Sequence, residues 1–524
     1  MSQGKKAGCL VAAVAWCVIL LILGVAYKFL VAPYFDEKLT DATGSDSRYT
    51  QEITLRADSF SGYAILRSPY LRNWLSKREI RLNIIDDGAD VPGRIDSMED
   101  GDIDFAVFTI DSFLSAGAEK GSFPGSIVMV LDETQGGDAV VAHESVFESI
   151  QSLDQPETRF VLTPASASEF LARVILANFN LPAIGGDWME TADGSQKVLS
   201  KLQKTSSSAP NAYVLWQPHV AQALQSPGFK VLLDSSQIKG YIVDVLVARR
   251  AFLRDQGDLA ETFIEGYFRS LYHYQNQASQ MQQLIAQDAS DSSGKTLETN
   301  LAQAVMDGIH WKNTLENYHH FGLQAAPDTA GHAHVEDMIE NIMDVLIKTS
   351  ALKKDPLNGQ YHTIYYDQLL RGLQLSNFHP GRSVNLIQGA GDPLPQADQG
   401  ALKSLPLSEA QWQQLKPVGT LKAEVISFVR GSANVSRSSQ RSVAKLARQL
   451  EAFPTFYLQI IGQTRSEGDA DANQRLANDR ASAVADLLSQ EGIPAWRVRT
   501  QAAPSQSASG NYQSVLFQVG QLPY

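Results

Sequence analysis

The stretch Ile53-Thr-Leu-Arg-Ala-Asp-Ser-Phe-Ser-Gly-Tyr63 decides the fold of the first half of the chain. Its first five residues have the composition of a short strand, and the Ser-Phe-Ser-Gly turn leads into a helix predicted over residues 61–77. Further strands are predicted at 80–85 and 104–108, with an acidic helix between them. Strands that alternate with helices at this spacing are typical of an α/β domain with a largely parallel sheet.

The same alternation begins again near Arg159 and predicts a second α/β lobe. A helix is predicted at 168–178, and strands are predicted at 160–162, 212–215, 229–233 and 241–248. The chain is mostly helical after this point. We therefore expect a two-lobed domain over residues 50–375. Two successive lobes form a cleft where they meet, and small-molecule sites favour such interfaces.

The residues before this domain predict a membrane anchor over residues 1–35. Ala7–Tyr27 is a run of 21 residues without a charge, and a helix of that length crosses a bilayer core of about 30 Å. Lys5 and Lys6 precede the run, which favours a cytoplasmic N-terminus. A cleaved secretory signal is the alternative, but such signals have an apolar run of about 7–15 residues and small residues at the cut site.

Composition narrows the class of protein further. Both cysteines, Cys9 and Cys17, lie inside the apolar run, so the exported part has no thiol and needs no disulfide. The formal net charge of -13 argues against a nucleic-acid partner, because phosphate contacts need clustered Lys and Arg.

Five segments of the two-lobed domain place small or aromatic residues at strand ends and helix starts: 58–63, 101–106, 163–168, 213–218 and 227–234. Together they resemble periplasmic solute-binding proteins of the nitrate, taurine and thiamine-precursor type. The resemblance covers about residues 50–375. It implies a small-molecule site in the cleft and no catalytic residue or cofactor.

Small polar residues at the strand–helix junctions of both lobes are the candidate ligand contacts. Free N–H groups and the positive end of the helix dipole favour a polar or anionic group there. The alternative is that the serines only cap their helices. No arginine occupies these turns, so a neutral polar ligand fits as well as a strong anion. The predicted ligand-binding residues are Ser59, Ser61, Gly62, Tyr63, Thr109, Ser166, Ser168, Trp216 and Gln217.

The last part of the chain predicts a separate domain. Residues 376–419 are rich in Gly, Pro, Gln and Ser and predict a linker. Residues 420–524 predict an α+β domain with helices at 438–451 and 472–491 and strands at 423–428, 456–461 and 514–519.

Two segments of this domain, Phe428–Ala433 and Ile460–Thr464, together with Asn473, Leu476, Arg480 and Ala481, resemble the OmpA-like peptidoglycan-binding domain. In that family an Asp and an Arg hold the diaminopimelate of the peptide stem. The resemblance implies that Thr464, Asn473 and Arg480 contact peptidoglycan. Arg465 occupies the usual Asp position and Gln463 the usual His position, so the partner of the stem's ammonium is lost. A solvated helix charge is the alternative role for Arg480.

Other motifs do not support catalysis or metal binding. Gly294-Lys-Thr296 lacks the earlier glycine of a phosphate loop, and His332, His334 and Glu336 lack further ligands for a metal. No set of nucleophile, base and orienting group is evident.

The sequence thus predicts a single-pass protein of the inner (cytoplasmic) membrane with the bulk of the chain in the periplasm. This protein binds or senses a small polar or anionic solute and contacts the cell wall. The alternative is a non-catalytic envelope scaffold or component of a protein complex with a vestigial cleft. A cryptic hydrolase that uses the cleft serines is a third hypothesis.

Overall fold

The computed structural model describes residues 49–217, 219–293, 299–324, 333–381, 406–429, 431–464, 469–504 and 515–522. The predicted anchor helix at 7–27 lies outside these ranges, as does most of the predicted linker. Among the described residues, no helix combines the length and apolar composition needed to cross a bilayer. The chain divides into two compact units, one of residues 1–53 with 73–82 and one of residues 54–72 with 83–524. The cleft and the C-terminal domain belong to the second unit.

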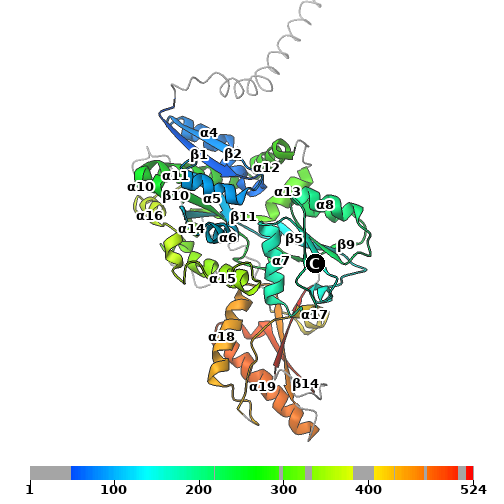
Figure 1. Cartoon of the computed structure of the whole chain (residues 1–524). Coiled ribbons are helices and arrows are strands. Elements are labelled where there is room, and N and C mark those ends of the chain that lie inside the picture. The colour runs from blue at the N-terminus through cyan, green and yellow to red at the C-terminus, as the bar shows by residue number, and fades with distance from the viewer. Residues whose placement is uncertain are drawn as a thin grey trace, which may run out of the picture. The chain divides into compact units, whose positions relative to one another are not determined.

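The first lobe is built on a six-stranded mixed sheet (Figure 1). Its strands are β1 (Gln51–Ala57), β2 (Ile80–Asp86), β3 (Phe105–Thr109), β4 (Gly125–Thr134), β10 (Val243–Arg249) and β11 (Ile309–Trp311). They follow the order β11-β4-β10-β3-β1-β2, with β1 parallel to β3 and β10 antiparallel to both β3 and β4. Every residue of β4 is buried, as expected for a strand covered on both faces.

The helix predicted over residues 61–77 is broken in the structure. It consists of η3 (Ser61–Tyr63), α3 (Ala64–Arg67) and α4 (Pro69–Ser76). The break lies at Ser68, whose backbone is extended (ψ 145) because the residue before a proline avoids the helical region.

The remaining helices of the first lobe come from two parts of the chain. They are α5 (Val91–Asp100), α6 (Ile110–Lys120), α10 (Arg250–Asp255), α11 (Gly257–Gln275), α12 (Ala278–Ser293), α13 (Thr299–Asp307), α14 (Thr314–His320), α15 (Val335–Lys348), η6 (Tyr361–Ile364) and α16 (Gln368–Leu375). α15 packs against α6 and also against α7 (Ala167–Asn178) of the second lobe.

The second lobe has a five-stranded sheet in the order β7-β6-β8-β5-β9. Its strands are β5 (Asp138–His143), β6 (Arg159–Leu162), β7 (Met189–Thr191), β8 (Asn211–Trp216) and β9 (Phe229–Asp234), and its other helices are η4 (Ile150–Leu153), α8 (Ser195–Lys204), α9 (His219–Ala223) and η5 (Ser235–Gln237). β6 is parallel to β7 and β8, whereas β5 is antiparallel to β8 and β9.

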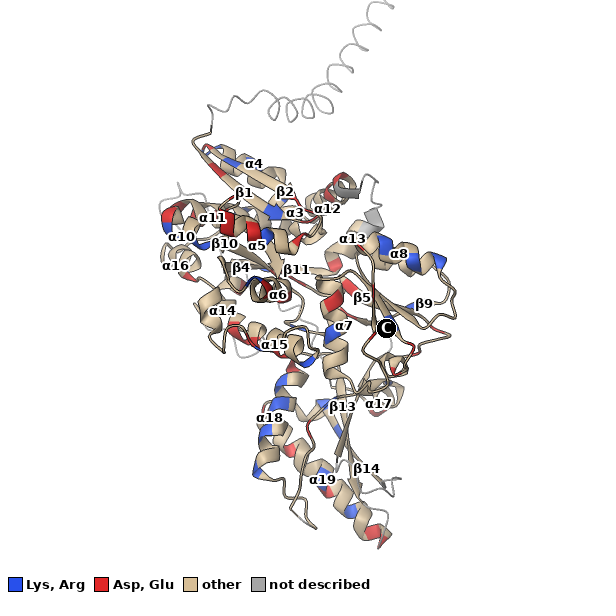
Figure 2. Ribbon diagram, viewed as in Figure 1, with Lys and Arg blue, Asp and Glu red and all other residues tan. Residues whose placement is uncertain are grey.

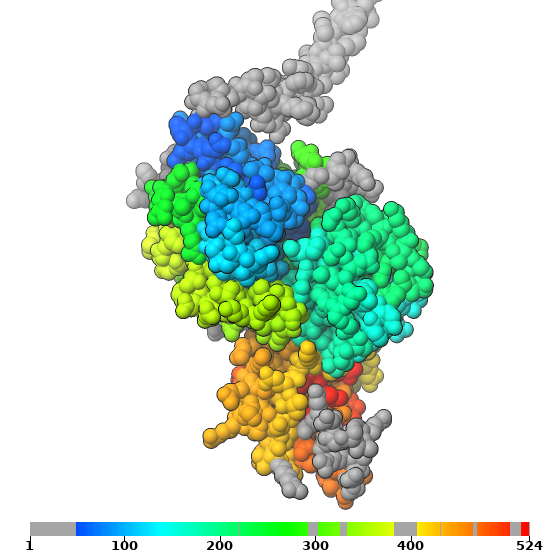
Figure 3. Space-filling model, viewed as in Figure 1, coloured from blue at the N-terminus to red at the C-terminus, as the bar shows by residue number. Residues whose placement is uncertain are grey.

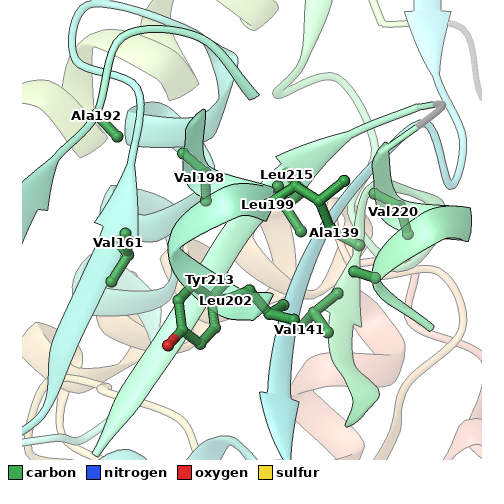
Figure 4. Packing of buried hydrophobic residues seen from close by; sticks show 11 residues of the cluster. Ala139, Val141, Val161, Ala192, Val198, Leu199, Leu202, Tyr213, Leu215 and Val220 are labelled. Atoms are coloured by element: carbon green, nitrogen blue, oxygen red, sulfur yellow. The ribbon is translucent and has the colours of Figure 1, made fainter. Parts of the chain in front are cut away.

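One face of this second sheet carries an apolar core. Val198, Leu199 and Leu202 project from α8 toward Val161 and Leu215 of the sheet (Figure 4). These residues are at most 2% exposed. Their burial stabilises the second lobe through the hydrophobic effect. Each large aliphatic side chain contributes about 1.5–3 kcal/mol to the free energy of folding.

The chain crosses between the lobes twice. β4 leads into β5 through Gln135–Gly137, and β9 leads into β10 through η5 and residues 238–242. Gly136 and Gly240 have φ of 100° and 71°, which a glycine adopts without the strain of a side chain. In each sheet the strand that arrives from the other lobe is inserted antiparallel. The sequence interpretation placed neither β4 nor β5, and so missed the first crossing. The strand predicted at 241–248 with the second lobe is β10 of the first sheet, because the chain crosses back before it.

The C-terminal domain is a four-stranded sheet with two long helices. Its elements are α17 (Glu409–Gln414), β12 (Lys416–Thr420), α18 (Arg437–Glu451), β13 (Tyr457–Thr464), α19 (Ala470–Gln490), η7 (Ala495–Arg497), β14 (Val498–Pro504) and β15 (Val515–Gln521). The order is β12-β15-β13-β14, with β13 parallel to β14 and antiparallel to β15.

The strand predicted over residues 423–428 is wrong. β12, which lies within the segment predicted as a linker, takes the place beside β15. Residues 422–427 have no regular structure, and Phe428 forms only an isolated bridge with Val435. Ile426 is buried, whereas Val425 is 58% exposed. The alternation of apolar residues in this segment therefore reflects the burial of one side chain and not a strand.

The C-terminal domain packs on the second lobe around Phe179. This ring lies 6.1 Å from the ring of Phe453 and 6.4 Å from that of Phe456, and all three side chains are buried. The backbone N–H of Asn180 donates to the carbonyl of Thr420 at 2.9 Å. The crossing segment takes part as well, because the N–H of Lys239 donates to the carbonyl of Ala452 at 2.6 Å.

Candidate functional site

A cavity of about 560 Å³, partly open to solvent, lies between the lobes. The molecular surface is hollowed between the first lobe, in blue, and the second lobe, in cyan to green (Figure 3). Three aromatic residues contribute to its wall: Phe60, Tyr63 and Trp216. Hydroxyl groups come from Thr109, Ser112, Thr134 and Ser166, and the ionisable wall residues are Asp58, Arg94, Asp138 and Asp244.

Four of the nine predicted ligand-binding residues line this cavity: Tyr63, Thr109, Ser166 and Trp216. The other five do not. Ser59 is exposed, whereas Ser61, Gly62 and Ser168 are buried away from the wall. The side chain of Gln217 accepts a hydrogen bond from the backbone of Ala221 instead. A role of any of the nine in binding stays a prediction.

The hydroxyl groups at the helix starts act as caps in the structure. Thr109 accepts from the N–H of Ser112 at 3.4 Å at the start of α6. Ser166 accepts from the N–H of Ser168 at 3.2 Å and donates to the carbonyl of Thr163 at 2.8 Å. These groups therefore hold the wall in place whether or not they also touch a ligand.

A row of polar groups crosses the first sheet beside the cavity. The register pairs Asp132 of β4 with Asp244 of β10, and Asp244 with Thr109 of β3. Directly paired residues of an antiparallel sheet lie on one face, and like charges opposite each other are destabilising. The hydroxyl of Tyr63 donates to Asp244 at 2.5 Å. Burial raises the pKa of Tyr63, so it remains a neutral donor.

Burial raises the pKa of the carboxyl groups in and beside the cavity. Desolvation raises the pKa of Asp132 and of Asp138 to about 7. Desolvation also raises the pKa of Asp244 well above its ordinary value, and the charge of Asp132 adds to this shift. These groups therefore retain protons at pH values at which an exposed aspartate is ionised.

Arg94 is the one cationic residue on the wall as described, and it is already paired. Its Nε and Nη2 donate to the two oxygens of Asp87, each at 2.7 Å, and Nη2 also donates to Asp58 at 2.9 Å. Its Nη1 donates to the carbonyl of Val107 at 2.5 Å. Burial lowers the pKa of Arg94, but the two carboxylates outweigh this effect and raise it.

A buried ion pair supports the crossing segment next to this row. Lys312 donates to Glu133 at 2.8 Å, and their side chains are 4% and 3% exposed. The other oxygen of Glu133 accepts from the N–H of Gly240 at 2.6 Å. Burial raises the pKa of Glu133, but Lys312 outweighs it and holds the pKa at about 2.

Sequence reasoning missed the carboxyl groups of this site. Asp58 was part of a quoted motif, whereas Asp132, Asp138 and Asp244 were not considered. These residues could have been found as single aspartates inside or beside a strongly apolar strand. A carboxyl group that is buried at such a position needs a partner, which makes it a candidate site residue.

The residues of the C-terminal domain that are predicted to contact peptidoglycan lie close together. The hydroxyl of Thr464 donates to the carbonyl of Asn473 at 3.2 Å. Arg480 is 9% exposed, donates to the carbonyls of Ser432 and Gln463, and lies 5.1 Å from the ring of Phe428. It is therefore not the solvated helix charge of the alternative interpretation. Arg465 lies outside the described residues.

Basic residues recur along α18, as the blue segments of its ribbon show (Figure 2), and they are exposed. Arg437, Arg441, Lys445 and Arg448 follow each other at spacings of three or four residues, which places them on one side of the helix. Lys445 pairs with Glu424 at 3.5 Å.

The metal and phosphate motifs gain no support. His334 is the N-cap of α15 and accepts from the N–H of Glu336 at 3.1 Å. His332 and Gly294–Thr296 lie outside the described ranges. Within the part of the chain that the structure describes, no three His, Cys, Asp or Glu residues are arranged to hold a metal ion.

Comparison with known proteins assigns the C-terminal domain. Residues 427–512 match the OmpA family. The chain is 34% identical over 76 residues to the probable lipoprotein YiaD of Escherichia coli (strain K12), covering 14% of this chain and 35% of that protein. It is 31% identical over 75 residues to the peptidoglycan-associated lipoprotein of Brucella melitensis biotype 1, covering 14% of this chain and 45% of that protein. The chain thus spans less than half the length of these curated relatives.

Solved structures similar to the chain include the periplasmic aliphatic sulphonate-binding protein SsuA of Escherichia coli. The match has a TM-score of 0.45 and 14% sequence identity, and it covers 61% of this chain and 99% of that protein. The two lobes described above, joined by two crossings, agree with the fold that the sequence resemblance implies. The chain thus joins two α/β lobes to a C-terminal domain that matches the OmpA family over residues 427–512.

Proposed function

We propose that this chain is a non-catalytic protein of the bacterial envelope that binds a small solute between its lobes and contacts peptidoglycan through its OmpA-family domain. The observation that carries the proposal is the interlobe cavity, with aromatic and polar walls drawn from both lobes and from Ile242 of the second crossing. Such a combination of apolar surface and a few convergent polar groups is typical of small-molecule sites.

Solute binding is tested by thermal unfolding of the full-length protein against a library of amines, alcohols, carboxylates and sulfonates. A ligand that binds only the folded state raises the unfolding midpoint. Trp216→Ala is expected to abolish the shift, whereas Trp74→Ala, on α4 outside the cavity wall, leaves it unchanged. Silence of the whole library would favour the alternative, an envelope scaffold with a vestigial cleft.

Two features support peptidoglycan contact. Thr464, Asn473 and Arg480 lie close together, and α18 has a basic face that suits the carboxylates of the stem peptides.

The N-terminal residues 1–35 are proposed as a single-pass anchor in the inner membrane, on the basis of their uncharged run. Removal of these residues is then expected to release the protein from the membrane fraction.

Arg480→Ala is expected to reduce cosedimentation with purified peptidoglycan by about tenfold, because a charge-assisted hydrogen bond is lost. Arg475→Ala is the matched control, since Arg475 is an exposed arginine of the same helix. Unchanged pelleting of an Arg480→Ala protein that still folds, judged by circular dichroism, would exclude this residue as the wall contact.

A further inference from the structure

The charge of the cavity wall carries an inference about the class of ligand. Three wall residues are carboxylic acids, Asp58, Asp138 and Asp244, and Arg94 faces them. A fourth carboxyl, Asp132, lies directly opposite Asp244 in the sheet. Two acidic residues in register are costly when both are ionised, and a bound positive charge would stabilise their ionised forms.

The protein's own cations do not supply that charge. Arg94 donates to Asp87, Asp58 and a backbone carbonyl, and Lys312 donates to Glu133. Among the described residues, no Lys, Arg or His forms an ion pair with Asp132, Asp138 or Asp244. An anionic ligand would therefore lie beside these carboxyl groups with no unpaired guanidinium or ammonium group of the described wall to bind it.

Further evidence for a ligand comes from a buried hydroxyl group of the cavity wall. Thr134 lines the cavity and is 2% exposed, and its hydroxyl forms no hydrogen bond of good geometry, although it lies close enough to Asp138 to lower the pKa of that carboxyl. Asp132 is fully buried beside the cavity, and its carboxyl hydrogen-bonds with that of Asp244, so the two groups can share a proton. Buried polar groups are normally satisfied, so the hydroxyl of Thr134 indicates room for a polar group of a ligand.

The aromatic part of the wall fits a cation as well. Phe60, Tyr63 and Trp216 line the same cavity as the carboxyl groups. The rings of Phe60 and Tyr63 meet edge to face with centroids 5.2 Å apart. Aromatic rings attract organic cations and pack against their apolar bodies.

We propose that the cavity binds a small organic cation whose ammonium or amidinium group donates to Asp244 and Asp138, and whose body packs against Phe60 and Trp216. This inference rests on the proposed solute-binding function and names the ligand class of that same site. It narrows the polar or anionic solute expected from the sequence; at the helix starts, the N–H groups of Ser112 and Ser168 already donate to the caps Thr109 and Ser166.

The test uses thermal unfolding and calorimetric titration of the full-length protein at pH 8. The probes share one aromatic body and differ in charge: benzylamine, benzamidine, benzyl alcohol and benzenesulfonate, with putrescine as an aliphatic cation. The expected result is binding of the cations and weaker or no binding of the alcohol and the sulfonate. Asp244→Asn and Asp138→Asn are each expected to weaken cation binding about tenfold.

The control is Asp96→Asn, which removes an exposed carboxylate paired with Lys120. It should leave cation binding unchanged. Tighter binding of the sulfonate, silence of every cation, a response to Ca²⁺ or Mg²⁺ alone, or full cation affinity in both variants would overturn the inference. Binding of the sulfonate would leave the proposed solute-binding function standing, whereas silence of all probes and of the wider library would overturn both.

Discussion

Lys312→Met is expected to destabilise the first lobe by about 3–5 kcal/mol, because it leaves the carboxylate of Glu133 buried without its counter-charge. The effect is measured as the free energy of unfolding in urea at pH 7. Lys312 is also the contact that holds the pKa of Glu133 at about 2 despite burial. The stabilising contribution is therefore present above the ordinary glutamate pKa of about 4.3 and is lost as the pH falls toward 2.

Lys120→Met is the control for this prediction. Lys120 forms ion pairs with Asp96 and Glu99 on the surface, and exposed pairs contribute about 0–1 kcal/mol. The double variant Glu133→Gln/Lys312→Met should recover part of the lost stability, since the glutamine oxygen still accepts from the N–H of Gly240. A cost for Lys312→Met no larger than that of the control would contradict the role given to the buried pair.

Asp132→Asn is expected to change stability in the opposite direction. Burial raises the pKa of Asp132 to about 7, whereas an aspartate of the unfolded chain titrates near 3.9. Between these values the folded state holds a proton that the unfolded state has lost, so stability falls as the pH rises from about 4 to 7. The substitution removes this loss and should stabilise the ligand-free protein by about 1–3 kcal/mol at pH 8.

The pH dependence separates this effect from a general change in packing. At pH 5 the carboxyl of Asp132 is protonated in the folded state, so the substitution should change stability little. The neighbouring Asp244, Tyr63, Glu133 and Lys312 stay in place in both proteins. Equal stabilisation at pH 5 and pH 8, or destabilisation at pH 8, would show that Asp132 is not a strained charge.

The two-lobed architecture could be predicted because the alternation of strands and helices is a local pattern. The positions of Tyr63, Thr109, Ser166 and Trp216 on the cavity wall follow from the same pattern, since strand ends gather at one edge of a sheet. The first crossing was missed because the centre of β4, Ile127–Leu131, is a continuous apolar run. A continuous apolar run does not distinguish a buried strand from a buried helix.

The carboxyl row could not be predicted from local patterns. Asp132 and Asp244 are far apart in the sequence and meet only through the register of β4 with β10. Neither the antiparallel insertion of β10 nor its bulges can be inferred from the spacing of apolar residues. The same limitation explains the misplaced strand at 423–428, because the pairing of β12 with β15 is also a tertiary choice.

The segment between β9 and β10 contacts three parts of the molecule. Its Gly240 bonds to the buried ion pair, its Ile242 lines the cavity, and its Lys239 bonds to the OmpA-family domain. A rotation of one lobe against the other must bend this segment and pull on the backbone of Ala452 at the end of α18. The cavity and the end of α18 are thus linked through the short segment of residues 238–242.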